Sequence, residues 1–126
     1  MVPEFLLPET TIREAGAGPV LDLGGYSGAL IVTLGITRIV EQESIDVSIY
    51  GSADGKEWSP KPLAAFPQKF YCGAYQMLVD LAGNPNARYL RAKWQANRWG
   101  KGEPKPLFAL YVFAETMQSA VAGVGV

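Results

Sequence analysis

Apolar and polar residues alternate along most of this chain, or the apolar residues form short blocks that end at Gly, Pro, Asn or Asp. A period of two places successive side chains on opposite faces of a strand. The helical spacing i, i+3, i+4, i+7 is not sustained over three turns. The pattern therefore predicts an all-β domain, with strands at residues 20–23, 29–34, 36–40, 44–50, 62–66, 69–72, 75–81, 89–95 and 107–114.

The clearest alternation lies at residues 44–50, where Ile45, Val47 and Ile49 share the face that we expect to point into the core. Earlier in the chain, Gly35 divides an apolar run that is rich in β-branched residues. Because glycine in a strand weakens pairing and often marks a bulge, we expect Gly35 to break or bulge the strand there.

The segment Ser52-Ala53-Asp54-Gly55 predicts a tight turn between two strands. Asp54 can accept hydrogen bonds from nearby backbone amides, and Gly55 is free to take a positive φ. Trp58 then begins the segment that returns antiparallel to the first strand. We interpret Ser52, Asp54, Gly55 and Trp58 as structural residues of this turn.

Eight or nine short strands in 126 residues are typical of a jelly-roll or Greek-key sandwich. The length suits one domain spanning residues 1–126, with residues 1–10 and 120–126 as extended terminal arms. The second arm is apolar and rich in Gly and Ala, so we expect the arms to pack on the domain or on a neighbouring subunit.

The composition narrows the possible functions. Hydrophobic residues make up 48% and charged residues 18%, which indicates a packed core. The net charge of −1 gives no global attraction to nucleic acid. The charge is uneven, however, with nine acids and three bases in residues 1–57 and three acids and eight bases in residues 58–126. If the halves form two poles, head-to-tail association would be favoured.

The chain contains no histidine, which excludes Ser-His-Asp and Cys-His nucleophile systems and histidine-based metal sites. Cys72 is the single cysteine, and we interpret it as a buried, inert thiol.

The carboxylates Glu41, Glu43 and Asp46 are interpreted as a solvated strand end rather than a catalytic pair. Together with Asp54 they are the alternative candidates for a structural Ca²⁺ site, although their spacing matches no EF-hand loop. We therefore expect no enzyme activity and no cofactor.

Two segments carry a resemblance to a known family. The first is a strand and turn at Ile45-Asp46-Val47-Ser48-Ile49-Tyr50-Gly51-Ser52-Ala53-Asp54-Gly55-Lys56-Glu57-Trp58, and the second is Ala87-Arg88-Tyr89-Leu90-Arg91-Ala92. Their order and separation resemble the discoidin (coagulation factor 5/8 type C) domains, and the two segments cover about a sixth of the chain, 20 of 126 residues. The resemblance implies a jelly-roll sandwich of the galactose-binding-like type, which binds glycans, lipid head groups or proteins through loops at one end.

The chain departs from the extracellular members of that family because it lacks the cysteine pair that often ties their termini. It is also similar to discoidin-like modules of phage and bacterial structural proteins. In those modules the same strand–turn–strand segment occurs without cysteines. The resemblance in this form implies an assembly role rather than lectin or lipid binding.

The candidate binding residues are aromatic and basic. Arg98 and Trp99 lie in a polar, Gly-containing segment, where a Trp is expected to dock on the fold or on a partner. Tyr71, Tyr75 and Phe66 could extend that surface, and Arg91 is the further candidate. Bases interleaved with aromatics also occur in single-stranded nucleic-acid binders. Alternation, however, turns Leu90, Ala92 and Trp94 toward the core, and we do not expect nucleic acid to bind.

The sequence thus favours a non-catalytic module that acts through protein–protein contacts, as a subunit of a homo-oligomer, particle or filament. The alternative is a carbohydrate-binding module that uses the loop aromatics and Arg98. Residues 1–8 lack the basic and long apolar regions of a signal peptide, and no apolar run reaches the ~18 residues of a membrane span. We expect a cytoplasmic protein, or a component of a particle assembled in the cytoplasm.

Overall fold

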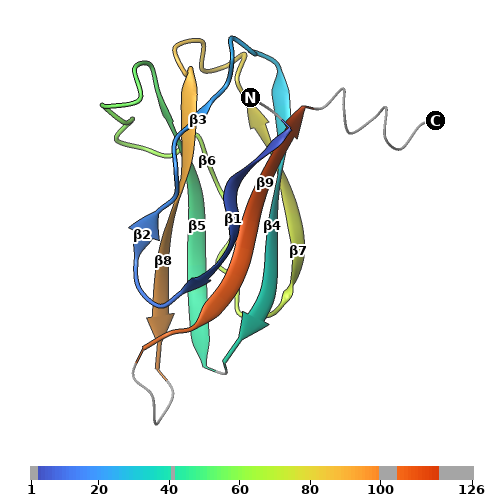
Figure 1. Cartoon of the computed structure of the whole chain (residues 1–126), viewed down its shortest axis with the longest axis vertical. Helices are drawn as coiled ribbons and strands as arrows, with labels where there is room; N and C mark the ends of the chain where they lie inside the picture. The colour runs from blue at the N-terminus through green and yellow to red at the C-terminus, as the bar shows by residue number, and fades with distance from the viewer. Residues whose placement is uncertain (1–2, 41, 100–104, 117–126) are drawn as a thin grey trace, which may run out of the picture.

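The computed structural model describes residues 3–40, 42–99 and 105–116. They form two antiparallel sheets packed face to face, and this part of the chain contains no helix (Figure 1). The strands are β1 (Glu4–Ile12), β2 (Gly16–Ala17), β3 (Leu21–Asp22), β4 (Ala29–Ile39), β5 (Glu43–Ser52), β6 (Ala64–Ala65), β7 (Gly73–Asp80), β8 (Tyr89–Arg98) and β9 (Phe108–Thr116). The prediction of an all-β sandwich is confirmed.

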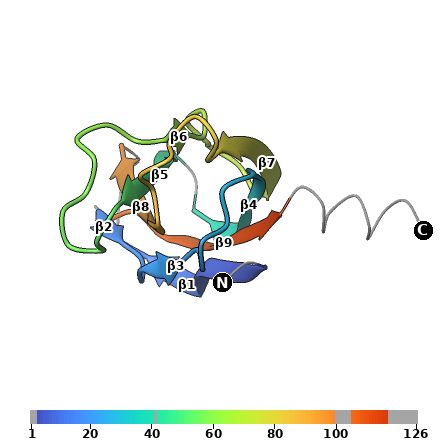
Figure 2. The ribbon, with the colours of Figure 1, turned by 90° about the horizontal axis from the view of Figure 1, so that it is seen from above.

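The strand order in the two sheets is that of a jelly roll. The first sheet has the order β1-β9-β4-β7, and the second has the order β2-β8-β5-β6 with β3 also paired to β8. Because β2 and β3 share one position beside β8, the fold has eight strand positions. Figure 2 shows the two sheets facing each other across the core. Each sheet therefore takes strands from both halves of the chain.

Alternation along each strand builds the core between the sheets. Ile45, Val47 and Ile49 are buried as the sequence predicted, and their neighbours Leu90 and Ala92 on β8 are buried beside them. From the first sheet, the same alternation buries Leu30, Val32, Leu34, Leu110 and Val112. The expected inward face of residues 89–95 is also largely confirmed, because Trp94 is half-buried against this core.

The expectation that Gly35 interrupts a strand is wrong. β4 continues through Gly35, and its register with β9 shifts between Ile36 and Arg38 instead. Gly35 lies opposite Tyr111, whose ring crosses the glycine so closely that a Cβ there would overlap with it. The glycine leaves room for a cross-strand aromatic side chain.

Other boundaries differ from the sequence prediction. Residues 4–10 of the expected N-terminal arm lie in β1, which pairs with β9 along the edge of the first sheet. Residues 69–72 are not a strand, since only Lys69 pairs, through an isolated bridge to Ile45. β8 runs three residues further than expected, so Arg98 ends a strand rather than lying in a loop. The arm at 120–126 lies outside the described residues.

The two outer faces of the sandwich have different chemistry. On the first sheet, Phe5 packs edge-on against Tyr111 and Phe113 with ring centroids 5.9 and 4.9 Å apart. Leu78, opposite Ile31 on the same face, is 56% exposed. This outer face is predominantly apolar.

On the second sheet, the outward positions are polar and charged. The Lys93 ammonium lies 4.6 Å from the ring centre of Tyr50, and the Arg91 guanidinium lies 4.4 Å from that of Trp58. Asp46 lies on the same outward side of β5. This face therefore has the chemistry of an ordinary solvated surface.

Candidate interaction surface

Three exposed aromatic side chains meet at the end of the sandwich where β8 ends and β5 begins (lower end in Figure 1). Phe70, Tyr71 and Trp99 are 41, 74 and 59% exposed. The ring centroids of Phe70 and Trp99 are 6.2 Å apart at 69°, and those of Phe70 and Tyr71 are 6.4 Å apart at 53°. We call these three residues the aromatic cluster.

Backbone hydrogen bonds hold both segments that carry the cluster. The Trp99 amide donates to the Gln42 carbonyl at 3.0 Å, and Gln42 turns the chain with a positive φ of 60°. Lys69, directly before Phe70, exchanges two backbone hydrogen bonds with Ile45, at 2.9 and 3.0 Å. The aromatic side chains are therefore carried by backbone that is anchored to the start of β5.

At the same end of the sandwich, the buried side chain of Glu43 links two backbone segments by hydrogen bonds. It is only 2% exposed, and its two carboxylate oxygens accept backbone amides from Val40 at 3.0 Å and from Leu107 at 2.8 Å. The interpretation of Glu43 as part of a solvated strand end is wrong. Its carboxylate joins the β4–β5 connection to the start of β9, while Glu41 lies outside the described residues.

Tyr75 supports the cluster more than it extends it. Its hydroxyl lies 2.9 Å from the Tyr71 carbonyl oxygen and 3.3 Å from that of Cys72, and the Lys69 ammonium lies 4.1 Å from its ring centre. These contacts fix the bend that presents Tyr71. The interpretation of Cys72 as a buried thiol is wrong, because this bend leaves Cys72 exposed.

The structure separates the two arginine candidates. Arg98 is half-buried at the end of β8, opposite Glu43 in the strand register and next to Trp99. Arg91 lies seven positions earlier on β8, opposite Tyr50, with its guanidinium over Trp58. Of the sequence candidates, Tyr71, Tyr75, Arg98 and Trp99 thus gather at one end, and Arg91 does not. The expectation that Phe66 extends this surface is wrong, because Phe66 is buried in the core. Phe70, which completes the cluster, was missed because its neighbours suggested an ordinary strand.

The Ser52–Trp58 turn lies at the opposite end of the sandwich. One carboxylate oxygen of Asp54 accepts the amides of Lys56 and Glu57 at 2.8 and 2.9 Å, and the Ser52 hydroxyl accepts the Gly55 amide at 2.8 Å. The backbone bonds from Glu57 and then Lys56, followed by the Ser52 hydroxyl, lower the pKa of Asp54 below 3.8. Gly55 has a φ of 78°. Every one of these contacts closes the turn on itself.

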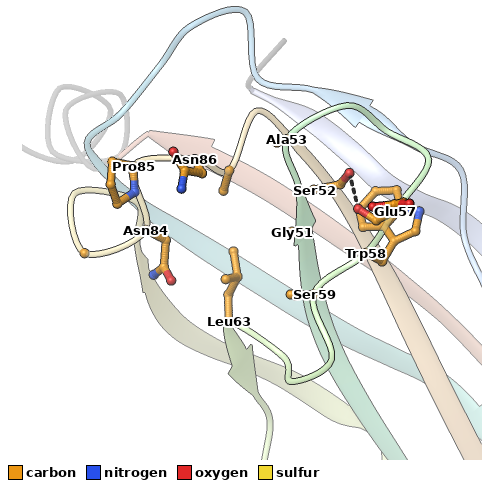
Figure 3. A pocket seen from close by; sticks show the side chains of 12 residues that line it. Gly51, Ser52, Ala53, Glu57, Trp58, Ser59, Leu63, Asn84, Pro85 and Asn86 are labelled. Atoms are coloured by element: carbon orange, nitrogen blue, oxygen red, sulfur yellow. Dashed lines mark hydrogen bonds between the residues drawn. The ribbon is translucent and has the colours of Figure 1, made fainter.

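A pocket of about 510 Å³ lies beside this turn, between it and the loop at residues 83–87. Figure 3 shows Leu63 and Asn84 lining the space between the two loops. Glu57 is its one ionisable lining residue, and the Asn84 side chain already donates to the Asp80 carbonyl at 3.0 Å. The pocket therefore offers no acid–base pair.

The described residues contain no group of three or more His, Cys, Asp or Glu side chains that could hold a metal ion. Within the same residues, no helix is long and apolar enough to cross a membrane. No protein-family model matches the chain, and no curated protein matches it in sequence.

Proposed function

We propose that this chain is a non-catalytic assembly module that contacts a neighbouring protein subunit through the aromatic cluster. The observation that carries the proposal is the exposure of Phe70, Tyr71 and Trp99 side by side on anchored backbone. Large aromatic side chains are costly to leave in water, and Trp, Tyr and Arg dominate the energetics of protein interfaces. Arg98 lies directly beside them in the chain.

A protein partner fits this surface better than a glycan does. The rings meet at 69° and 53°, so they form no flat platform on which a sugar ring could stack. The Tyr75 hydroxyl and the Gln68 amide, which could otherwise bond sugar hydroxyls, already contact backbone carbonyls and the side chains of Ser44 and Asp46. Projecting aromatic side chains such as these can insert into complementary pockets on a protein partner.

The discoidin-like assignment is part of the same proposal. The two segments that resemble the family touch each other, because the Arg88 amide donates to the Ser52 carbonyl at 2.8 Å and Tyr89 pairs with Ser52. The jelly-roll strand order agrees with that family. The aromatic cluster lies at the end of the sandwich away from this turn.

Size-exclusion chromatography with light scattering tests the proposal. We expect the wild-type chain to form a complex larger than its 13.6 kDa monomer, and the Tyr71→Ala/Trp99→Ala variant to form a smaller one. Val20→Ala is the control, since Val20 is 47% exposed but lies outside the cluster, and it should leave the mass unchanged.

An equal mass for wild type and the double variant would refute the assembly proposal. A glycan-array signal that disappears in Trp99→Ala, from a chain that stays monomeric, would favour the carbohydrate-binding alternative instead.

A further inference from the structure

β7 is an edge strand of the first sheet. Gly73–Asp80 pairs with β4 in an unbroken register, from Ala29 opposite Asp80 to Ile36 opposite Gly73. Apart from this pairing with β4, no backbone hydrogen bond among the described residues joins residues 73–79 to another element. Alternate N–H and C=O groups of an edge strand point away from the sheet. Figure 1 shows β7 along the outer margin of the sheet.

The other edge of this sheet is protected against strand addition, and β7 is not. β1 contains Pro8 and the charged residues Glu4 and Glu9, and its register with β9 shifts twice. Proline, charge and bulges are the devices that keep edge strands from pairing with other chains. Residues 73–79 contain no proline and no charged residue, and their register with β4 does not shift.

In the second sheet, the described edges are too short to pair. β6 and β2 have two residues each, and Pro62 and Pro67 flank β6. Within the described part of the chain, β7 is thus the long, regular edge without protection. Such a strand is a template for β-augmentation.

The side chains of β7 are also incompletely covered on both faces. Tyr75 and Met77 point toward the core but are only half-buried, unlike Val79. On the outer face Leu78 is 56% exposed. A strand added beside β7 would cover apolar surface on both sides of the sheet while pairing the free backbone groups.

We propose that β7 pairs antiparallel with β7 of a second copy of this chain, about a two-fold axis centred on Gln76. This register uses the whole uncharged segment 73–79 and brings Gln76 opposite Gln76 of the second copy. It also sets Tyr75 opposite Met77, so that core-facing side chains meet core-facing side chains. The two first sheets then become one continuous eight-stranded sheet.

Charge favours a second copy as the occupant. Glu4 and Glu9, the charged residues of β1, are both acidic, so pairing β1 with its own copy would gather like charges, whereas residues 73–79 carry no charge to repel. The side-chain amide of Gln76 can both donate and accept, so two copies can bond each other across the axis. An isologous contact of this kind closes as a dimer.

This inference concerns a different surface from the aromatic cluster, and the test keeps the two apart. In the Tyr71→Ala/Trp99→Ala background, light scattering should give twice the 13.6 kDa chain mass. Adding Gln76→Lys or Gln76→Glu should weaken this dimer by about tenfold or more, because like charges then face each other. Mixing the two variants should restore a heterodimer.

Thr33→Lys is the matched control. Thr33 lies beside Gln76 on the same outer face, one strand in from the edge, and accepts a hydrogen bond from its amide at 3.3 Å. Edge-to-edge pairing predicts that Thr33→Lys leaves the dimer intact. If Thr33→Lys dissociates the dimer as strongly as Gln76→Lys does, the chains dock face to face and the edge proposal is wrong.

Cross-linking gives a second, independent measurement. In a Cys72→Ser chain, Gln76→Cys should form an intermolecular disulfide on mild oxidation, since directly opposite Cβ atoms lie about 4.5–5.5 Å apart. Ala74→Cys should cross-link to itself several-fold less.

A monomer in the double-variant background overturns the edge proposal, as does a set of polydisperse aggregates or a Gln76→Cys chain that does not cross-link. Loss of the dimer on removal of residues 117–126 alone would identify that segment as the occupant of β7 and would also overturn it. The aromatic-cluster proposal fails separately, if the Tyr71→Ala/Trp99→Ala chain has the mass of wild type.

Discussion

Replacing Glu43 by glutamine should destabilise the protein far more than its position at the end of a strand suggests. The buried carboxylate accepts one backbone amide on each oxygen, from Val40 and from Leu107. The glutamine side chain keeps one acceptor oxygen but turns an NH₂ group toward the other amide. One buried N–H group then loses its acceptor, and the remaining bond loses its charge.

The magnitude follows from these two bonds. A hydrogen bond to a charged group contributes about 1.5–3 kcal/mol, and a neutral one contributes about 1 kcal/mol. Glu43→Gln should therefore lower the free energy of unfolding by about 2–4 kcal/mol. Glu43→Ala, which removes both acceptors, should cost about 3–5 kcal/mol, with the upper limit reduced by water that can reach the freed amides at the end of the sandwich.

Urea unfolding followed by circular dichroism, at matched protein concentration, measures this loss. With a slope of roughly 1.5–2 kcal/mol/M for a domain of this size, Glu43→Gln should lower the midpoint by about 1–2.7 M. Glu57→Gln is the control, since Glu57 is exposed, and it should change stability by no more than about 0.5 kcal/mol. Equal midpoints for the Glu43 and Glu57 variants would refute the reasoning.

Three further predictions concern the turn and the sheets. Asp54 contributes stability that is present above pH 3.8 and is lost as the pH falls through its lowered folded-state pKa, so Asp54→Asn should reduce the acid destabilisation seen in thermal melts across that range. Gly35→Ala should cost about 1–3 kcal/mol by displacing the Tyr111 ring, and much less in a Tyr111→Ala chain; equal costs in both backgrounds would argue against the clash. Arg91→Ala should cost about 0.5–1 kcal/mol through its lost contact with Trp58, and Arg91→Lys should recover part of this cost in the same unfolding assay.

Local alternation was sufficient to predict the centre of this fold. Ile45, Val47 and Ile49 could be assigned to the core because the period of two is uninterrupted there. β1 was missed because Pro8 and the polar residues 9–11 obscure that period, and its strand conformation depends on pairing with β9 about a hundred positions later. β-propensity is weak where such pairing decides the outcome.

The features that shape the candidate surface depend on distant neighbours. The role of Glu43 requires the Leu107 amide, 64 positions away, and that of Gly35 requires the ring of Tyr111. The sequence predicted the importance of Trp99 from the cost of exposing it. It could not show that Phe70 would lie beside Trp99, because that contact depends on the bridge from Lys69 to Ile45.

The jelly-roll strand order also constrains how the chain can fold during synthesis. β1 pairs with β9, and β5 pairs with β8, so neither sheet can be completed until most of the chain has been made. Such non-local pairing slows folding, and apolar strands stay unpaired and exposed until their partner strands are made. The apolar residues Leu6 and Leu7 of β1 in particular stay without their strand partner until Phe108–Thr116 has emerged. The charges and the single proline, Pro8, of β1 would then limit premature association of nascent chains, at the stage when that edge is most exposed.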